Sequence, residues 1–314
     1  MTENQSQFTA KWIGVDWGST NFRAYAVDDS YNLVDSVESN SGLNSVSNNE
    51  FESVLIQHIQ HWLSDHHPMI IVMSGMVGAR QGWVEAPYRE TPCRISGSQE
   101  LLTVPTIDPR LRVFVVPGVC QLDPADVMRG EETQVFGYLA KNENFSGLIC
   151  LPGTHSKWVD VRDLTIQRFR TWMTGELFDV LSNQSVLRYS TATEDWDHSA
   201  FMHAAQKALS LKEGILEALF SIRARDLLQD VSAAESKATL SGLVLGAECA
   251  QALHWYQSNE QQPIPLIGAE KLTSLYASVL SLAGRTCEIV DIASVNLSGL
   301  KSVANSVLSE NSNA

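Results

Sequence analysis

Residues 12–23 read Trp12-Ile-Gly-Val-Asp-Trp-Gly-Ser-Thr-Asn-Phe-Arg23. The apolar start predicts a buried strand, the polar middle predicts a tight turn, and a second strand follows through Val27. Gly18 would let backbone N–H groups approach a phosphate, and the hydroxyls of Ser19 and Thr20 would add donors. Asp16 could hold a metal-bound water. An ordinary hairpin with a polar turn explains the same residues equally well, so the rest of the chain has to decide.

A second stretch has the same organisation. Residues 147–151 predict a buried strand, 152–157 form another turn rich in Gly and hydroxyls, and 158–161 and 166–172 predict two more strands. This repeat predicts two similarly folded halves whose turns face each other across a cleft and offer donors to a polyphosphate. The expected phosphate contacts of the second turn are Gly153, Thr154, His155 and Ser156. We expect His155 to form hydrogen bonds or pack rather than to act as a base.

The remaining pattern predicts a mixed α/β chain. A wholly apolar run at 69–73 predicts a central parallel strand, and 112–116 predicts a further buried strand. We expect a loop from residue 126 that runs into a helix, and Thr174 as the N-cap of a helix after it. Polar residues 230–237 predict a solvated linker before a helix at 240–257. The predicted domains are residues 1–140 and 147–296, with a tail helix at 297–309 that packs on the first.

Composition excludes several classes of function. The 314 residues carry a formal net charge of −14, which repels nucleic acid and anionic membranes. The polar N-terminus lacks the features of a secretory signal, and no apolar run reaches the length of about 20 residues that spans a bilayer. Five widely spaced cysteines are typical of a reduced, cytoplasmic protein. A homodimer is compatible with the sequence.

Candidate catalytic and binding groups lie in three further places. Glu131 and Glu132 precede a predicted helix, where one could take a proton from an attacking hydroxyl, although capping of the helix explains them too. Gly268 follows a late strand and could approach a purine, or form a plain turn. The segment after residue 73 supplies donors and aromatic rings that suit a sugar acid: Ser74, Gly75, Met76, Arg80, Trp83, Glu85 and Tyr88.

Several long blocks resemble the 2-dehydro-3-deoxygalactonokinase family. The opening stretch is the first of them, and the others follow in the family's order up to about residue 246. They are Ser74-Gly-Met-Val-Gly-Ala-Arg-Gln-Gly-Trp83, Val116-Pro-Gly-Val119, Met128-Arg-Gly-Glu-Glu-Thr-Gln134, Leu151-Pro-Gly-Thr-His-Ser-Lys-Trp158, Thr171-Trp-Met-Thr-Gly-Glu-Leu-Phe178 and Ser241-Gly-Leu-Val-Leu-Gly246.

The resemblance implies two ribonuclease-H-like domains of the actin-like ATPase superfamily, with the nucleotide in a cleft between them. It implies ATP- and Mg²⁺-dependent phosphorylation of 2-dehydro-3-deoxy-D-galactonate at its 6-hydroxyl, in galactonate breakdown. By likeness to exopolyphosphatases it favours Glu131 over Glu132 as the base. The position of Asp16 at the end of the first strand favours it as a metal organiser. The region around Gly268 departs from the family's usual Gly-Asp-Pro run. The alternatives are a kinase for a related keto-deoxy sugar acid, a phosphate-anhydride hydrolase, or a nucleotide-binding regulator without catalysis.

Overall fold

The computed structural model describes residues 10–47, 50–94, 101–210, 215–257 and 262–311. The chain divides into two compact units. Unit 1 comprises Met1–Phe145, Asp163–Ile166 and Ala293–Ala314, and unit 2 comprises Ser146–Arg162 and Gln167–Ile292. Each unit is described below by itself.

Unit 1 is built on a six-stranded mixed sheet with the order β3-β2-β1-β4-β8-β7. Its strands are β1 (Trp12–Trp17), β2 (Phe22–Val27), β3 (Leu33–Ser39), β4 (Met69–Gly75), β7 (Leu102–Val104) and β8 (Leu111–Val115). β1 runs antiparallel to β2, and β4 runs parallel to both β1 and β8. The prediction of a central parallel strand at 69–73 is therefore confirmed.

A small sheet and the α-helices α1, α2 and α9 also belong to unit 1. The sheet has the order β10-β9-β5. These elements are β5 (Tyr88–Glu90), β9 (Gly118–Leu122), β10 (Ala125–Met128), α1 (Phe51–Ile59), α2 (Glu131–Lys141) and α9 (Ile292–Asn311). The loop expected from residue 126 was wrong, because that segment pairs with β9 as the second strand of a hairpin. Only Arg129 and Gly130 separate β10 from α2.

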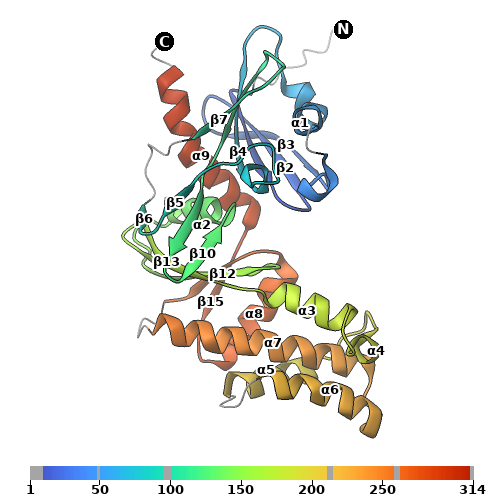
Figure 1. The fold of residues 1–314 in the computed structure, drawn as a ribbon. Coiled ribbons are helices and arrows are strands. Elements are labelled where there is room, and N and C mark those ends of the chain that lie inside the picture. Colours follow the sequence, from blue (N-terminus) through green and yellow to red (C-terminus); the bar gives the residue numbers. More distant parts are fainter. Residues whose placement is uncertain (1–9, 48–49, 95–100, 211–214, 258–261, 312–314) are drawn as a thin grey trace, which may run out of the picture. The chain divides into compact units, whose positions relative to one another are not determined.

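The two faces of β1 bury different side chains, as the period of two along a strand requires. Ile13, Val15 and Trp17 pack in one cluster with residues of α1. Trp12, on the opposite face, packs in another cluster with Leu300 of α9. The first strand of the chain is thus enclosed by an early helix and by the last one (Figure 1).

Unit 2 repeats the strand arrangement of unit 1. Its sheet runs β15-β14-β11-β12-β13, and Thr165 and Ile166 of β13, which belong to unit 1, pair with β6 (Cys93–Arg94). The strands are β11 (Gly147–Leu151), β12 (Ser156–Arg162), β13 (Thr165–Trp172), β14 (Ile264–Ile267) and β15 (Cys287–Val290). As in unit 1, the first strand is antiparallel to the second and parallel to a later one. The predicted repeat is confirmed.

The helices of unit 2 are α3 (Thr174–Asn183), α4 (Arg188–Thr191), α5 (His198–Ser210), α6 (Ile215–Gln229), α7 (Ala233–Tyr256) and α8 (Glu270–Leu282). The linker expected at 230–237 was wrong, because α7 already begins at Ala233. Ser232 caps this helix by accepting a hydrogen bond from the backbone N–H of Glu235. Thr174 is not an N-cap: Met173 takes that position, and Thr174 is the first helical residue.

Two further findings concern the cysteines and the possibility of a membrane-spanning helix. Every cysteine of the sequence carries a free thiol. Within the described ranges, no helix is both long and apolar enough to cross a membrane.

Candidate active site

Asp16 lies near the end of β1 with a side chain that is 13% exposed. Its Oδ2 atom accepts hydrogen bonds from Asn296 Nδ2 at 2.8 Å and from Arg23 Nη1 at 3.4 Å. Arg23 stands opposite it on β2 and also reaches Glu38 on β3, at 2.8 Å. Burial raises the pKa of Asp16, and the positive charge of Arg23 opposes that shift.

Three segments of unit 1 meet beside Asp16. In the register of the parallel pair β1–β4, Asp16 stands opposite Ser74 and Trp17 opposite Gly75. Gly75 has φ 97°, and a Cβ atom there would lie 2.6 Å from the carbonyl oxygen of Trp17. Gly130 has φ 105°, and a Cβ atom on it would lie 3.1 Å from Gly75 Cα. These glycines bring the start of α2 against the carboxyl ends of β1 and β4.

The two glutamates at the start of α2 have different surroundings. Glu132 is fully buried, accepts a hydrogen bond of 2.7 Å from the N–H of Gly130, and contacts the hydroxyl of Thr133 at 3.1 Å. Burial and the charge of Glu131 raise the pKa of Glu132 to about 8. Glu131 is half-buried and accepts from the N–H of Arg129 at 3.0 Å. Its charge also raises the pKa of Asp16, which places the two carboxylates within electrostatic range.

The turn after β1 is supported through its backbone. The N–H of Gly18 donates to Asn21, and the carbonyls of Gly18 and Ser19 accept from Leu43 and Asn44 at 2.9 and 3.0 Å. Ser19 and Thr20 are themselves exposed. Their hydroxyls are therefore accessible to a ligand.

The residues predicted to bind a sugar acid are not all gathered in one place. Arg80 and Glu85 form an ion pair of 3.3 Å, and their side chains are 80% and 57% exposed. Trp83 stacks on Phe51 of α1 and packs against the core. Tyr88 is exposed, and the guanidinium carbon of Arg129 lies 4.3 Å from the centre of its ring.

Arg129 was not among the predicted residues. It is buried, and its Nη2 donates to the carbonyl of Ala86 at 2.8 Å. Its Nε and Nη1 atoms are also buried and have no hydrogen-bond partner among the residues that the structure describes. The block Met128–Gln134 contains it, so its place beside the glutamate pair could have drawn attention to it.

In unit 2 the second turn and Gly268 lie together. A Cβ atom on Gly268 would lie 3.0 Å from the carbonyl oxygen of Pro152, and one on Gly153 would meet open space. Thr154 and His155 are exposed. The first turn of α3 packs against them: the N–H of Glu176 donates to the carbonyl of Thr154 at 3.0 Å, and its carboxylate pairs with His155 at 2.5 Å.

Ser156 differs from its neighbours because its hydroxyl is buried. It contacts the carboxylate of Glu248 on α7 at 2.9 Å. Glu248 is also buried, and burial raises its pKa. This glutamate was missed because, from the sequence, it is one more residue of a helix. Thr154 therefore supplies the accessible hydroxyl of this segment, next to the exposed side chain of His155.

The fit of Asp16 to Mg²⁺ can be judged from its oxygens. Mg²⁺ is usually bound by one or two carboxylates, with substrate phosphates and waters as its other ligands. The recorded hydrogen bonds of Asp16 both end on Oδ2, so Oδ1 suits a metal-bound water. Over the described residues there is no group of three or more His, Cys, Asp or Glu side chains that could hold a metal. With one oxygen held by Asn296 and Arg23, Asp16 offers Oδ1 as a single carboxylate ligand.

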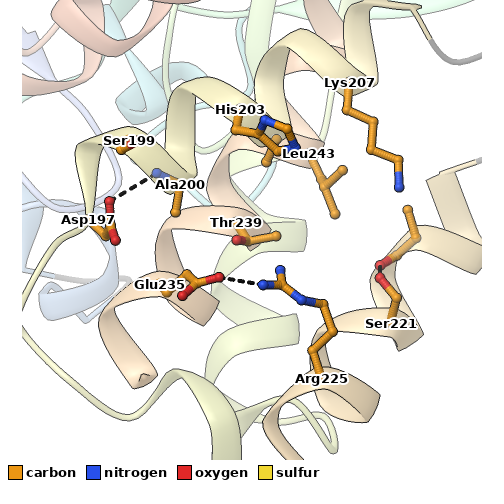
Figure 2. Close-up of a pocket in the computed structure, with 12 residues that line it drawn as sticks. Asp197, Ser199, Ala200, His203, Lys207, Ser221, Arg225, Glu235, Thr239 and Leu243 are labelled. Carbon is orange, nitrogen blue, oxygen red and sulfur yellow. Dashed lines mark hydrogen bonds and ion pairs between the residues drawn. The ribbon is translucent and has the colours of Figure 1, made fainter. Parts of the chain in front are cut away.

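A polar cavity of about 580 Å³ lies elsewhere in unit 2, between α5, α6 and α7 (Figure 2). The ion pair between Arg225 and Glu235 crosses it, and His203 and Lys207 of α5 lie along its side. The residues that line it include none of those predicted to bind nucleotide or sugar. The cavity is therefore separate from the Pro152–Ser156 turn of the same unit.

Comparison with known proteins gives a consistent result. A family model described as 2-keto-3-deoxy-galactonokinase matches residues 16–303. A Rhizobium meliloti (strain 1021) protein described as a "probable 2-dehydro-3-deoxygalactonokinase" is 34% identical over 94% of this chain and 97% of its own. The 2-dehydro-3-deoxygalactonokinase of Escherichia coli (strain K12) is 33% identical over 95% and 99%. A crystal structure from Sinorhizobium meliloti, to which the same function has been attributed, superposes with a TM-score of 0.88 at 33% identity, over 94% of this chain and 99% of that one.

Proposed function

Because the chain belongs to the 2-keto-3-deoxy-galactonokinase family, we propose that it transfers a phosphate group from ATP to 2-dehydro-3-deoxy-D-galactonate. The near-complete coverage of both relatives and the agreement of fold with the Sinorhizobium structure support this activity. We expect the 6-hydroxyl to be the acceptor. The free cysteines are compatible with a cytoplasmic enzyme, and a homodimer stays a prediction.

The observation that carries the mechanism is the difference between the two glutamates. Phosphoryl transfer needs a carboxylate near the attacking hydroxyl, able to accept its proton. Glu132 is enclosed and engaged with Gly130 and Thr133. Glu131 is partly exposed, and its charge acts on Asp16. Glu131 is therefore our choice for the base, and Glu132 fixes the start of α2.

The turn of each unit contributes to binding the polyphosphate of ATP. In unit 1 these contacts come from Gly18 and the exposed Ser19 and Thr20. In unit 2 they come from Gly153, Thr154 and His155, with Ser156 behind them and Gly268 beside Pro152. Mg²⁺, held through Asp16, would neutralise charge on the transferred phosphate.

Sugar-acid binding is assigned to the last residues of β4 and the segment that follows them. Ser74 and Gly75 lie opposite Asp16 and Trp17, so the start of this segment adjoins Glu131. The residues assigned to the substrate are Ser74, Gly75, Met76, Arg80, Trp83, Glu85 and Tyr88. Of these, Arg80 is the exposed cation that can meet a carboxylate, while the stacking of Trp83 on Phe51 gives it a packing role as well.

Release of ADP with a panel of sugar acids tests this function. The galactonate-derived acid should be turned over with the highest kcat/KM, and its gluconate-derived epimer with a lower one. Preference for the epimer would assign the enzyme to a related keto-deoxy acid. ADP release without any sugar would favour a phosphate-anhydride hydrolase, and ATP binding without turnover would favour a regulator.

A further inference from the structure

Glu248 stands at the centre of a buried hydrogen-bonded cluster in unit 2. Its Oε1 atom accepts from Trp158 Nε1 at 2.7 Å. Its Oε2 atom lies 2.9 Å from Ser156 Oγ and 2.8 Å from the hydroxyl of Tyr276. The side chain of Thr174 adds a further hydrogen bond. One carboxylate of α7 therefore joins β12, α8 and the first residue of α3.

This arrangement is unusual for a purely structural core. No cationic side chain is among the partners recorded for Glu248 in the described part of the chain. A buried carboxylate costs free energy that well-packed apolar side chains of similar volume would avoid. Here the cost is offset by neutral donors alone. A carboxylate retained under these conditions fixes the positions of the groups that donate to it.

Two of those groups control the second turn. Ser156 is the residue at which the turn enters β12, so its bond to Glu248 anchors the base of the turn. Thr174 begins α3, whose next residues lie on the turn itself. A Cβ atom on Gly175 would lie 2.5 Å from the carbonyl of Gly153, and the N–H of Glu176 bonds the carbonyl of Thr154.

We propose that Glu248 is a positioning residue that holds the Pro152–Ser156 turn in the conformation that binds the phosphates of ATP. It acts through Ser156 at the end of the turn and through Thr174 at the start of α3, and it does not contact the substrate itself. This inference rests on the proposed kinase function. It adds a residue that lies 92 positions along the chain from the turn it orders.

The test compares Glu248→Leu with Glu248→Gln. Leucine removes the carboxylate that accepts from these four donors. Tyr276 keeps a contact of 3.1 Å with Ser156, and Ser156 keeps one of 3.5 Å with the carbonyl of Trp172, but their link to α7 is lost. The dissociation constant for ATP should therefore rise about tenfold or more. The KM for the sugar acid should stay within about twofold, because the affected turn serves the nucleotide. Glutamine should restore most of the affinity, because an amide oxygen can accept from Trp158 while Ser156 and Tyr276 can turn to accept from its NH₂.

A control variant in the same core distinguishes the positioning role of Glu248 from a general loss of stability. Leu219→Ala removes apolar volume in α6 from the cluster that contains Trp158 and Tyr276, and should lower Tm without weakening ATP binding. Should Glu248→Leu fail to fold, Ser156→Ala and Tyr276→Phe each remove one donor and should each weaken ATP binding. Wild-type affinity in those variants, or equal weakening in Leu219→Ala, would overturn the proposal.

The test of Glu248 can be distinguished from the test of the proposed kinase activity. Calorimetric titration with ATP needs no sugar acceptor, so it tests the turn even if the acceptor has been assigned wrongly. If the protein did not phosphorylate the galactonate-derived acid but its ATP binding still depended on Glu248, the substrate assignment would be wrong and the positioning role would stand. Absence of ATP binding in the wild-type protein would overturn both.

Discussion

The side-chain amide of Asn296 donates a hydrogen bond of 2.8 Å to Oδ2 of Asp16, although the two residues are 280 positions apart. Asn296 is buried on α9, the last helix, and Asp16 lies near the end of the first strand. Arg23 contacts the same oxygen, so a neutral donor and a cation together orient one carboxylate. The proposed metal organiser of unit 1 is thus held in place from the C-terminal end of the chain.

Replacing Asn296 should therefore impair activity without touching the substrate. Asn296→Leu removes the donor, and kcat/KM should fall about tenfold with a higher Mg²⁺ concentration needed for half-maximal rate. Ser302→Ala, on the same helix but with its hydroxyl bonded to the backbone of Ser298, is the matched control and should behave as wild type. An unchanged Mg²⁺ dependence in Asn296→Leu would refute the positioning of Asp16.

Asp16→Asn tests the metal role directly. The amide keeps the size of the side chain and its carbonyl oxygen can still accept from Asn296, but it removes the negative charge that Mg²⁺ and its waters need. We expect activity at low Mg²⁺ to fall by more than about tenfold, with partial recovery as Mg²⁺ is raised. Activity measured across a Mg²⁺ titration checks this. A curve that coincides with that of the wild-type enzyme would make Asp16 a structural turn residue.

Glu131→Gln tests the assignment of the base. The amide cannot accept a proton, so kcat should fall about 10²- to 10⁴-fold. The dissociation constant for ATP should stay within about threefold, because Glu131 is assigned to the sugar hydroxyl and not to the nucleotide. Single-turnover kinetics and calorimetry measure the two quantities separately. Near-normal turnover would exclude Glu131 as the base.

Glu132→Gln should change how stability depends on pH. The pKa of Glu132 is raised from 4.5 to about 8, so the folded protein binds this proton more tightly than the unfolded chain. The wild-type free energy of unfolding therefore falls as pH rises between those two values, by at most about 1.4 kcal/mol per pH unit. The variant has no proton to lose at this position, so its stability relative to wild type should rise from pH 5 to pH 8.

Urea unfolding at several pH values measures that difference. Glu143→Gln, at an exposed position of the same unit, is the control and should leave the pH profile as in wild type. A difference between Glu132→Gln and wild type that stays constant with pH would mean that Glu132 ionises normally in the folded protein.

Arg80→Ala tests the assigned contact with the substrate carboxylate. We expect the KM for the sugar acid to rise about tenfold, while the KM for ATP serves as the internal control and stays constant. The ion pair with Glu85 is exposed, so its loss should change the free energy of unfolding by less than about 1 kcal/mol. An unchanged KM for the sugar acid would move the carboxylate contact to another cation.

The sequence by itself determined the strands and their repetition. Apolar runs such as 69–73 and 147–151, and the Gly-rich turns that follow first strands, predicted both sheets, because burial of a strand is determined by its own residues. Where the pattern was weaker, as at 230–237, helix α7 began earlier than expected because the Ser232 cap outweighed the polar composition.

Tertiary structure alone decided which polar groups meet. Nothing in the sequence pairs Asn296 with Asp16, or Glu248 with Ser156, because those bonds depend on where α9 and α7 pack. The tertiary structure also gave the two adjacent glutamates different surroundings, because Glu132 is buried and Glu131 is partly exposed. Hydrophobic periodicity can be read along a chain, but hydrogen-bond partners and desolvation depend on distances between segments that only the folded chain sets.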